Sequence, residues 1–341
     1  IVPVLQGEWL MADGTTLGAD DGIGVATALA ILDANDIEHG PIECLFTVDE
    51  ETGLSGASAL SPEALKSRIL LNLDSEDEGE IFIGCAGGVD TLAKLPFDKE
   101  ETPAGAYFRI YVKGLKGGHS GDDINKGLGC ANKLLNRILW AADKEMDMRL
   151  ATFDGGNLRN AIAREAYADV VVMEQEAEDL KQLVAKYSDE LKYEFRTTEP
   201  NMQVGIEAIP MPEFVVDMLS QDNLLNVLYA CPHGVLSMSR EIPGFVETST
   251  NLASVKMQEG YFMITTSQRS SLESAKDAAA SRVESCFLLA GADVEHTDGY
   301  PGWSPNTDSY ILKVAVESYK RLFGKEPIVR AIHAGLECGL I

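Results

Sequence analysis

Acidic residues gather in four short stretches of the sequence, and they are the first candidates for chemistry. The stretches are Asp20-Asp21 in "LGADDGIG", Asp49-Glu50-Glu51 in "TVDEETG", Asp74 in "LNLDSEDEGE", and Glu76-Asp77-Glu78 directly after it. Several carboxylates can share one cleft only if a cation neutralises them or their pKa values rise. A divalent metal site is therefore the economical interpretation. Oxygen ligands alone suit magnesium, calcium or manganese, whereas an added histidine favours zinc.

Two of these stretches also have ordinary structural explanations. Aspartate at the start of a helix is a common cap, and "ADDG" is good turn chemistry. "SEDEGE" is typical of a solvated loop. Either stretch alone favours such an explanation. Three acids directly after the apolar run at 42–48 shift the balance towards a metal site.

The elements that must position the acids alternate between strand and helix. Three apolar runs predict strands and two segments predict helices, the second helix beginning at Ser61; in chain order they are strand 2–6, helix 22–35, strand 42–48, helix 61–68 and strand 69–74. This order predicts an α/β fold with a mainly parallel sheet covered by helices on both faces. Ligands of such sheets bind at the carboxyl ends of the strands, where the acids lie.

The middle of the chain has a different pattern. Half-buried antiparallel strands are predicted by the alternation in "YFRIYVKG", "EAYADVVVM" and "YFMITTSQR", and amphipathic helices lie between them. We therefore expect an inserted α+β domain over 89–297. Residues 1–88 and 298–341 would form the first domain together, because the helix at 308–324 and the last segment are expected to rejoin its sheet.

Bulk properties exclude several classes of partner. The formal net charge of −26 argues against nucleic acid and anionic membranes, which require clustered Lys and Arg. No apolar run approaches the ~20 residues of a membrane span. The six cysteines form no C-x-x-C pair, which favours reduced thiols of a cytoplasmic protein. No signal peptide is visible, although the chain opens directly in a predicted strand, so a segment upstream of it is compatible with the sequence.

One histidine stands out. His119 lies in "GLKGGHSGDD", where glycines allow the backbone to approach a ligand closely. A phosphate-binding loop is the alternative, but the lysine spacing of such loops is missing, and Asp122 and Asp123 would repel phosphate. The other four histidines, taken singly, are more typical of surface or satisfied polar positions.

Taken together, the strings resemble the co-catalytic zinc peptidases, a family that includes carnosinase and the acetylornithine and succinyl-diaminopimelate deacylases. Within it they are most similar to the bacterial aminoacyl-histidine (Xaa-His) dipeptidases. The matching strings run across nearly the whole chain: "VLQG", "TTLGADDGIG", "DEETGLSGA", "LLNLDSEDEGEIFIGCAGG", "GLKGGHSG", "GLGCANKLL", "GGNLRNAIARE", "GYPGW" and "IHAGLECGL".

The resemblance implies an α/β catalytic domain with an inserted lid, two divalent metal ions and roles for nine residues. Zinc is favoured, with manganese or cobalt as alternatives, and a homodimer is expected. The implied roles are metal ligands Asp20, Glu51 and Asp74, general base Glu50, oxyanion stabiliser His119, and substrate-binding residues Asn160, Arg269, His333 and Glu337. Glu50 would take a proton from a metal-bridged water that attacks the peptide carbonyl.

The sequence departs from the family pattern at two places. The family follows "VLQG" with H-x-D and carries a last zinc histidine in an "HSPDE"-like segment, but here Gly7 is followed by Glu8 and neither histidine is present. We interpret this as a gap in the sequence rather than a metal-free relative, with the catalytic domain incomplete at both ends. The interpretation predicts that Gly7 and Glu8 are not bonded.

Hydrolysis of short dipeptides, with Xaa-His favoured, is the predicted function. An N-acyl amino acid deacylase of the same group and a catalytically inactive binding module on the same fold are the alternatives. Glu50 argues against the inactive module, because a structural metal site needs no additional base. A glycosidase with paired carboxylates is disfavoured, since adjacent Glu50 and Glu51 are poorly suited to flank a sugar bond.

Overall fold

The structure is a computed structural model that describes residues 1–50, 54–75 and 77–341. The chain forms two compact units, each built from separate segments. Unit 1 consists of Ile1–Ile83, Asn306–Arg330 and Leu336–Ile341, and unit 2 consists of Gly84–Pro305 and Ala331–Gly335. Glu51 and Glu76, two of the predicted acids, lie outside the described residues.

Unit 2 is built on an antiparallel sheet. Its strand order is β14-β4-β13-β12-β7-β8-β6-β9, and β11 pairs with β12. The strands are β4 (Gly87–Pro96), β6 (Ala106–Lys113), β7 (Arg149–Gly155), β8 (Ala166–Val172), β9 (Gln203–Ala208), β11 (Gly234–Met238), β12 (Val246–Gln258), β13 (Tyr261–Ser270) and β14 (Asp293–His296). A separate pair joins β5 (Lys99–Glu100) to β10 (Val215–Val216). The predicted strands near 107–114, 165–173 and 261–269 are confirmed as β6, β8 and β13.

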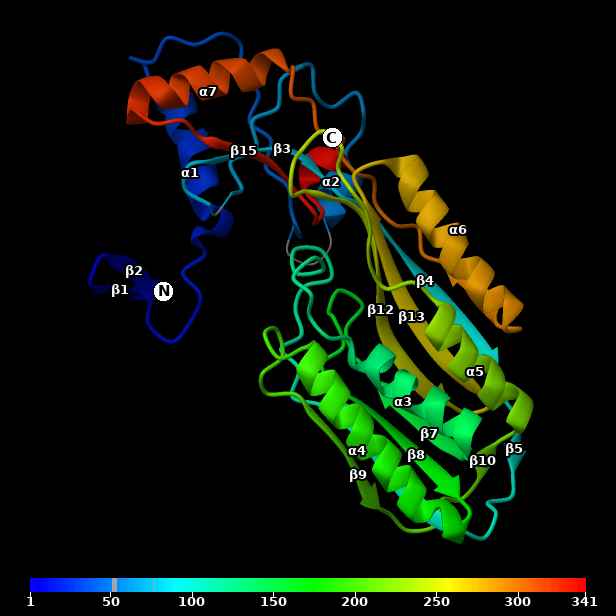
Figure 1. Cartoon of the computed structure of the whole chain (residues 1–341). Helices are drawn as coiled ribbons and strands as arrows, with labels where there is room; N and C mark the ends of the chain where they lie inside the picture. Colours follow the sequence, from blue (N-terminus) through cyan, green and yellow to red (C-terminus); the bar gives the residue numbers. More distant parts are fainter. Residues whose placement is uncertain (51–53, 76) are drawn as a thin grey trace. The chain divides into compact units, whose positions relative to one another are not determined.

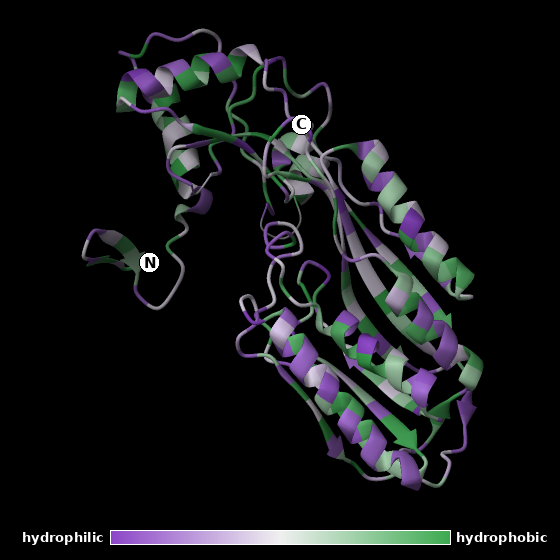
Figure 2. Cartoon of the chain, in the orientation of Figure 1, coloured by the Kyte–Doolittle hydropathy of each residue, from purple (hydrophilic) through white to green (hydrophobic). Residues whose placement is uncertain are grey.

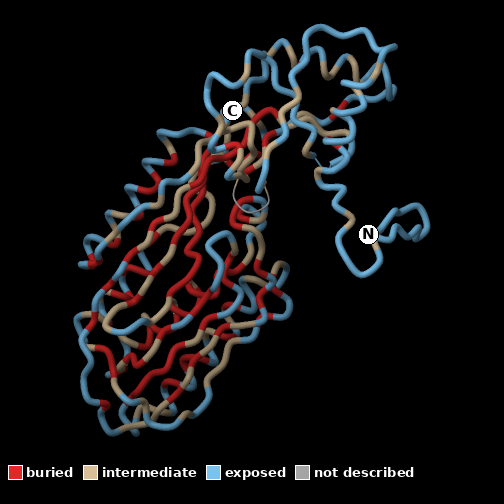
Figure 3. Tube along the Cα trace, turned by 180° about the vertical axis from the view of Figure 1, so that it is seen from behind, coloured by how far each residue is buried: buried red, intermediate tan, exposed pale blue. Residues whose placement is uncertain are grey.

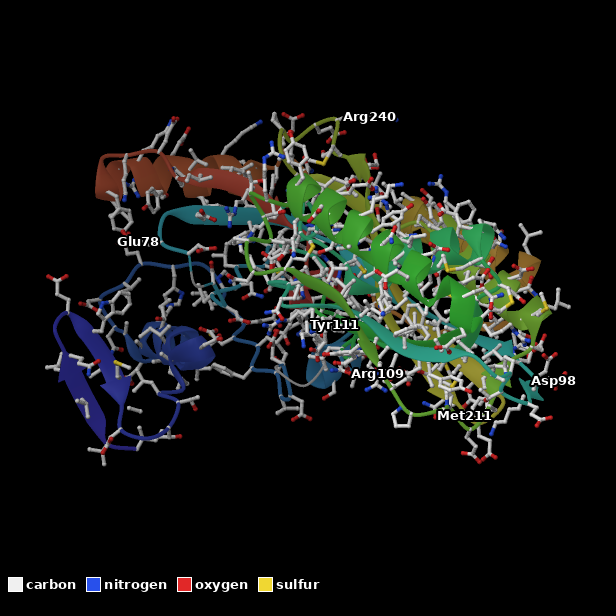
Figure 4. The ribbon with its side chains drawn as sticks, turned by 60° about the horizontal axis from the view of Figure 1, so that its bottom comes forward. Glu78, Asp98, Arg109, Tyr111, Met211 and Arg240 are labelled. Atoms are coloured by element: carbon white, nitrogen blue, oxygen red, sulfur yellow. The ribbon has the colours of Figure 1, made fainter. Side chains whose placement is uncertain are left out.

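The side chains of β6 alternate between the hydrophobic core of unit 2 and the opposite face of the sheet. Phe108, Ile110 and Val112 are buried in the hydrophobic core of unit 2, whereas the side chains between them are half-buried. Arg109 and Tyr111 therefore lie on the opposite face of the sheet, where both are labelled in Figure 4. Such alternation is typical of an antiparallel sheet with one covered face.

Helices cover the core face of this sheet. They are α3 (Ala131–Glu145), α4 (Ala177–Glu194), α5 (Met218–Ala230) and α6 (Glu273–Leu289), preceded at α4 by the short turn η1 (Glu174–Glu176). Figure 1 shows α3 and α4 side by side over the strands of unit 2. Hydrophobic and hydrophilic residues recur around α4 in Figure 2, which fits its buried Leu180, Leu183 and Leu191. The predicted helices at 130–146, 175–195 and 272–291 are confirmed.

Unit 1 contains little regular structure. It holds the antiparallel hairpin β1 (Pro3–Gln6)–β2 (Trp9–Ala12), α1 (Ala19–Asp33), α2 (Ser55–Ser58), α7 (Tyr310–Phe323) and the turn η2 (Glu337–Gly339). Strands β3 (Glu80–Cys85) and β15 (Ile328–Ile332) form a two-stranded sheet. The predicted helices at 22–35 and 308–324 are confirmed as α1 and α7. Gly7 and Glu8 form the turn of the hairpin.

Three predicted elements of unit 1 are wrong as secondary structure. Residues 42–48 and 69–74 form no strand, and residues 61–68 form no helix. An apolar run becomes a strand only when neighbouring strands bond its backbone, and no described strand of unit 1 pairs with either run. Figure 3 shows buried residues concentrated in unit 2, while the hairpin of unit 1 is exposed.

The mixed α/β class with an inserted α+β part is nevertheless confirmed, although the described residues of unit 1 contain no multistranded parallel sheet. Of the described helices, none combines the length and apolar character needed to cross a membrane.

Candidate active site

The first candidate cluster lies in unit 1 and consists of Asp20, Asp21, Glu50 and Asp74. Asp20 and Asp21 open α1 with non-helical dihedral angles and are joined by a cis peptide bond. The side chain of Asp21 turns back and accepts a hydrogen bond from the backbone N–H of Gly24 at 2.9 Å. Asp21 thus caps the start of α1, whereas the side chain of Asp20 forms a hydrogen bond with Asp74.

The pKa of Asp74 shows how closely the carboxylates lie. Burial raises this pKa to about 7, helped by a side-chain hydrogen bond with Asp20 and by the charges of Glu50, Asp20 and Asp21. All three charged neighbours are acids. The backbone N–H of Asp74 donates to Asn72 Oδ1 at 2.8 Å, which fixes the residue at the end of its run. Asp20 and Asp74 thus share a hydrogen bond, and the charge of Glu50 reaches Asp74.

The backbone around Glu50 leaves any extended conformation. Asp49 has a positive φ of 56°, and its carboxylate accepts a hydrogen bond from Ser55 Oγ at 3.0 Å. The N–H of Leu54, just before α2, donates to the carbonyls of Asp49 and Glu50.

Glu337 lies beside the segment that leads to Glu50. Its Oε1 accepts a hydrogen bond from Thr47 Oγ1 at 2.7 Å, three residues before Glu50. The sequence prediction placed Glu337 in a substrate-lining loop, and the structure puts it beside the acidic segment of unit 1.

The last acidic stretch belongs to a different environment. Arg330 forms ion pairs with Asp77 at 3.3 Å and Glu80 at 2.6 Å, and Lys325 lies 3.8 Å from Glu78. Glu78 is labelled in Figure 4. Because basic residues of the C-terminal part neutralise these acids, Asp77 and Glu78 do not belong to the candidate cluster.

In the described part of the chain, no three His, Cys, Asp or Glu side chains converge closely enough to hold a metal ion. Glu51, a predicted metal ligand, lies outside that part. The donor chemistry of Asp20 and Asp74 nevertheless fits a divalent cation: two carboxylates share a hydrogen bond, and neighbouring acids suppress ionisation. A cation is the group that would relieve this repulsion.

The second candidate cluster lies in unit 2 around His119. Two backbone N–H groups, of Gly121 and Asp122, donate to its Nδ1 at 3.3 Å each. The backbone N–H of His119 donates to Asp123 Oδ2 at 2.6 Å. His119 Nδ1 also lies 3.5 Å from Asp122 Oδ2, so these contacts all hold the ring on its Nδ1 side.

Arg269 contributes a buried positive charge to this cluster. Its side chain lies on β13 and the residue is only 7% exposed. Nε donates to Ser120 Oγ at 3.3 Å and Nη1 donates to Tyr300 Oη at 2.8 Å. Among the described residues, no carboxylate lies within ion-pair distance of Arg269. The charge of Arg269 also lowers the pKa of Asp122, so it reaches that carboxylate without forming an ion pair with it. A buried guanidinium whose printed hydrogen bonds go to hydroxyls can bind an anionic ligand.

His333 and Asn160 complete the cluster. His333 is buried, and its Nε2 lies 2.7 Å from Ser249 Oγ. Burial lowers its pKa to about 3, helped by the charge of Arg269. The carbonyl of Asn160 accepts from the N–H of Ser120, which places it beside His119. The structure therefore brings His119, Asn160, Arg269 and His333 into one part of unit 2.

Sequence reasoning missed three side chains of this cluster: Ser120, Ser249 and Tyr300. Ser120 directly follows His119, and Tyr300 lies in "GYPGW", so proximity to a quoted motif was the available signal. Ser249 carries no signal, because it belongs to no quoted motif and β12 is buried along most of its length.

An α/β unit with clustered carboxylates and an inserted α+β unit define the class of peptidases with an inserted dimerisation domain. The model of the peptidase dimerisation domain matches residues 105–199, from the start of β6 to just beyond α4. The chain is 46% identical over 341 residues to the cytosol non-specific dipeptidase of Escherichia coli, covering all of this chain and 70% of that protein. It is also 45% identical over 82 residues to peptidase T of Salmonella arizonae, covering 23% of this chain and 20% of that protein.

Among solved structures, the crystal structure of the aminoacylhistidine dipeptidase from Vibrio alginolyticus superposes with a TM-score of 0.93 and 43% identity. The match covers 99% of this chain and 69% of that one. The chain belongs to the peptidase family of the cytosol non-specific dipeptidase. This finding confirms the family that the sequence motifs indicated.

Proposed function

We propose that the chain hydrolyses the peptide bond of dipeptides, Xaa-His dipeptides among them, with the help of divalent metal ions. One observation carries the proposal: burial, a hydrogen bond with Asp20 and the charges of neighbouring acids raise the pKa of Asp74 in unit 1 to about 7. The family of the chain is a peptidase family. Two carboxyl groups that share a hydrogen bond beside further acids suit a cation and the hydrolytic chemistry that it supports.

Asp20, Glu51 and Asp74 are the residues that would hold the metal. Carboxylate oxygens bind zinc, and manganese or cobalt is compatible with the same donors. When bound, the metal would polarise the peptide carbonyl and lower the pKa of a coordinated water. Asp49 has a supporting role in the proposal, because its hydrogen bond from Ser55 holds the turn that presents Glu50.

Glu50 is the proposed general base. It takes the proton of the attacking water and returns it to the leaving amine. Its charge acts on Asp74, which supports a role for Glu50 at the carboxylate cluster. General-base catalysis by a positioned carboxylate contributes about 10²–10⁴ in rate.

Four residues of unit 2 are assigned to substrate recognition and charge stabilisation. His119 would donate from Nε2 to the oxyanion that forms at the peptide carbonyl, since its Nδ1 already accepts backbone hydrogen bonds. Arg269 would bind the carboxylate end of the dipeptide, because its buried charge has no carboxylate partner among the described residues. Asn160 and His333 would line the same site, and Glu337 is proposed to contact substrate from unit 1.

The proposed range of substrates rests on the names of the two relatives that match this chain over nearly its whole length. One is called a non-specific dipeptidase and the other an aminoacylhistidine dipeptidase. We therefore propose activity on a range of dipeptides that includes Xaa-His. The name of the cytosol non-specific dipeptidase supports a cytoplasmic location, and the dimerisation-domain match at 105–199 supports a homodimer.

The proposed roles also assign the predicted domains. Residues 1–88 and 298–341 would form the catalytic metal-binding domain, and residues 89–297 the lid that closes over the dipeptide.

The test is hydrolysis of a panel of dipeptides by the chelated protein before and after addition of Zn²⁺. The panel contains alanyl-histidine, carnosine, alanyl-leucine and an N-acetyl amino acid. We expect zinc-dependent turnover of all three dipeptides and little of the N-acetyl amino acid. Turnover of the N-acetyl amino acid alone would indicate a deacylase, and absence of turnover with any metal would contradict the proposal.

A further inference from the structure

We propose that Tyr300 is a positioning residue for Arg269 and thereby sets the preference of the enzyme for peptides with a free carboxylate. The inference rests on the proposed function, because it concerns how the proposed substrate is held. Tyr300 Oη accepts a hydrogen bond of 2.8 Å from Arg269 Nη1. No other side chain except Ser120 forms a hydrogen bond with this guanidinium among the described residues.

The backbone of Tyr300 is held at three points. It forms an isolated antiparallel bridge with Gly88 at the start of β4, with N–H···O distances of 2.9 Å and 3.0 Å. Lys276 Nζ donates to the carbonyl of Tyr300 at 2.9 Å, and Glu273 Oε2 lies 2.8 Å from the same ammonium group. Lys276 is itself buried, so this anchor belongs to the interior of unit 2.

The ring of Tyr300 is held between two glycines. A Cβ atom at Gly88 would lie 2.7 Å from Cζ of the ring, and a Cβ atom at Gly335 would lie 2.8 Å from Cε2. Real Cβ atoms do not approach other atoms so closely, so both positions require glycine if the ring is to stay in place. The phenol is therefore a rigid support that extends from β4 to the guanidinium.

The chemistry of Arg269 explains why such a support matters. A guanidinium recognises a carboxylate through two parallel N–H···O bonds, which require the plane of the group to be fixed. Arg269 is buried and has no described carboxylate within ion-pair distance that could fix it. The two hydroxyls of Ser120 and Tyr300 orient it while leaving its positive charge for a ligand. Loss of one hydroxyl would loosen the guanidinium without removing it.

The experiment compares alanyl-histidine with its amide, alanyl-histidinamide, in the metal-loaded full-length protein. For Tyr300→Phe we expect KM for alanyl-histidine to rise about tenfold while kcat stays within about twofold, as for loss of one hydrogen bond to a charged group. Kinetics on the amide should not change, because the amide does not use the carboxylate contact. Gly335→Ala keeps the hydroxyl but displaces the ring, and should give the same selective rise in KM.

Tyr111→Phe is the matched control, since Tyr111 lies on the outer face of the sheet against Gly205. It should leave both substrates unaffected. The inference is overturned if Tyr300→Phe affects the two peptides equally or affects neither.

Failure of the proposed function would be a separate result, namely no turnover of either peptide by the unsubstituted protein. Titration of histidine and histidinamide by calorimetry then decides the inference without activity. Binding of histidine about tenfold weaker in Tyr300→Phe would support it. Equal binding by both proteins, or no binding of histidine, would contradict it.

Discussion

The two units of the chain differ in the charges and hydrogen-bond partners that surround their buried polar groups. In unit 2, the buried Arg269 donates hydrogen bonds to two hydroxyls, and His333 Nε2 lies 2.7 Å from Ser249 Oγ. In unit 1, Asp74 is surrounded by other acids, and its proton is retained up to about pH 7. The difference indicates that unit 2 is organised by its own residues to orient a ligand, whereas the acids of unit 1 require a cation from outside.

The units also differ in how their apolar residues are used. Phe153, Phe262 and Phe287 of unit 2 are fully buried. In unit 1, Leu29 of α1 is 53% exposed and Leu71 is 66% exposed. Unit 2 therefore carries the larger hydrophobic stabilisation per residue, and substitutions in the two units should have very different effects on unfolding.

The largest effect is expected at the carboxylate cluster. Glu50→Gln removes the proposed base while keeping its size, so kcat for alanyl-histidine should fall about 10²–10⁴-fold. Metal content measured by atomic absorption should be unchanged. Glu78→Gln is the matched control, because its side chain is 93% exposed and is paired only with Lys325. Equal kcat values for Glu50→Gln and Glu78→Gln would remove Glu50 from the mechanism.

The next effect tests the contrast in packing. Phe262 is fully buried on β13, so Phe262→Ala should lower the free energy of unfolding by about 3–5 kcal/mol. Leu29→Ala, at an exposed position, should change it by about 0.5 kcal/mol or less. Urea denaturation measures both values. Comparable losses for the two variants would show that α1 is packed as tightly as the core of unit 2.

A third effect depends on pH. His333 has its pKa lowered to about 3 by burial, whereas the unfolded chain binds this proton near pH 6.5. The unfolded state thus binds more protons between these values, and the stability present above pH 6.5 should be lost as pH falls towards 3. Between pH 7 and pH 4 the loss should be on the order of 3 kcal/mol. Denaturation of His333→Asn should show a shallower decline, and an identical pH profile would contradict this assignment.

The smallest effect is expected where acids and bases are already paired at the surface. Arg330 is half-exposed and pairs with Asp77 and Glu80. Arg330→Gln should therefore change the free energy of unfolding by at most about 1 kcal/mol and leave kcat unaltered. A marked loss of activity would mean that the Asp77 segment supports the carboxylate cluster after all.

The sequence allowed part of this contrast to be predicted. Alternation in β6, β8 and β13 was sufficient, because one face of each strand packs on helices of the same unit. The apolar runs at 42–48 and 69–74 were wrongly predicted to be strands. A strand forms only where a neighbouring strand bonds its backbone, and the pattern of apolar residues does not show whether such a neighbour exists. Likewise, Ser61 and Pro62 are good helix-start residues, but residues 61–68 form only a turn, in which Ser61 Oγ accepts the N–H of Glu63 at 3.4 Å.

Site residues were predictable to the extent that motifs contain them. Asp20 shares a hydrogen bond with Asp74, the charge of Glu50 reaches Asp74, and His119, Asn160, Arg269 and His333 share one region of unit 2. The resemblance named Asp74 rather than Asp77 as a ligand, and the fold adds that Arg330 pairs with Asp77. The support of Arg269 by Tyr300 was also unpredictable, since the two residues lie 31 positions apart in the sequence.

The central claim is that the acids of unit 1 form a divalent cation site, and calorimetric titration of the chelated protein with Zn²⁺ tests it directly. The account predicts saturable binding that is at least about tenfold weaker in Asp74→Asn and unchanged in Glu78→Gln. Equal zinc affinity in the unsubstituted protein and in Asp74→Asn would contradict it.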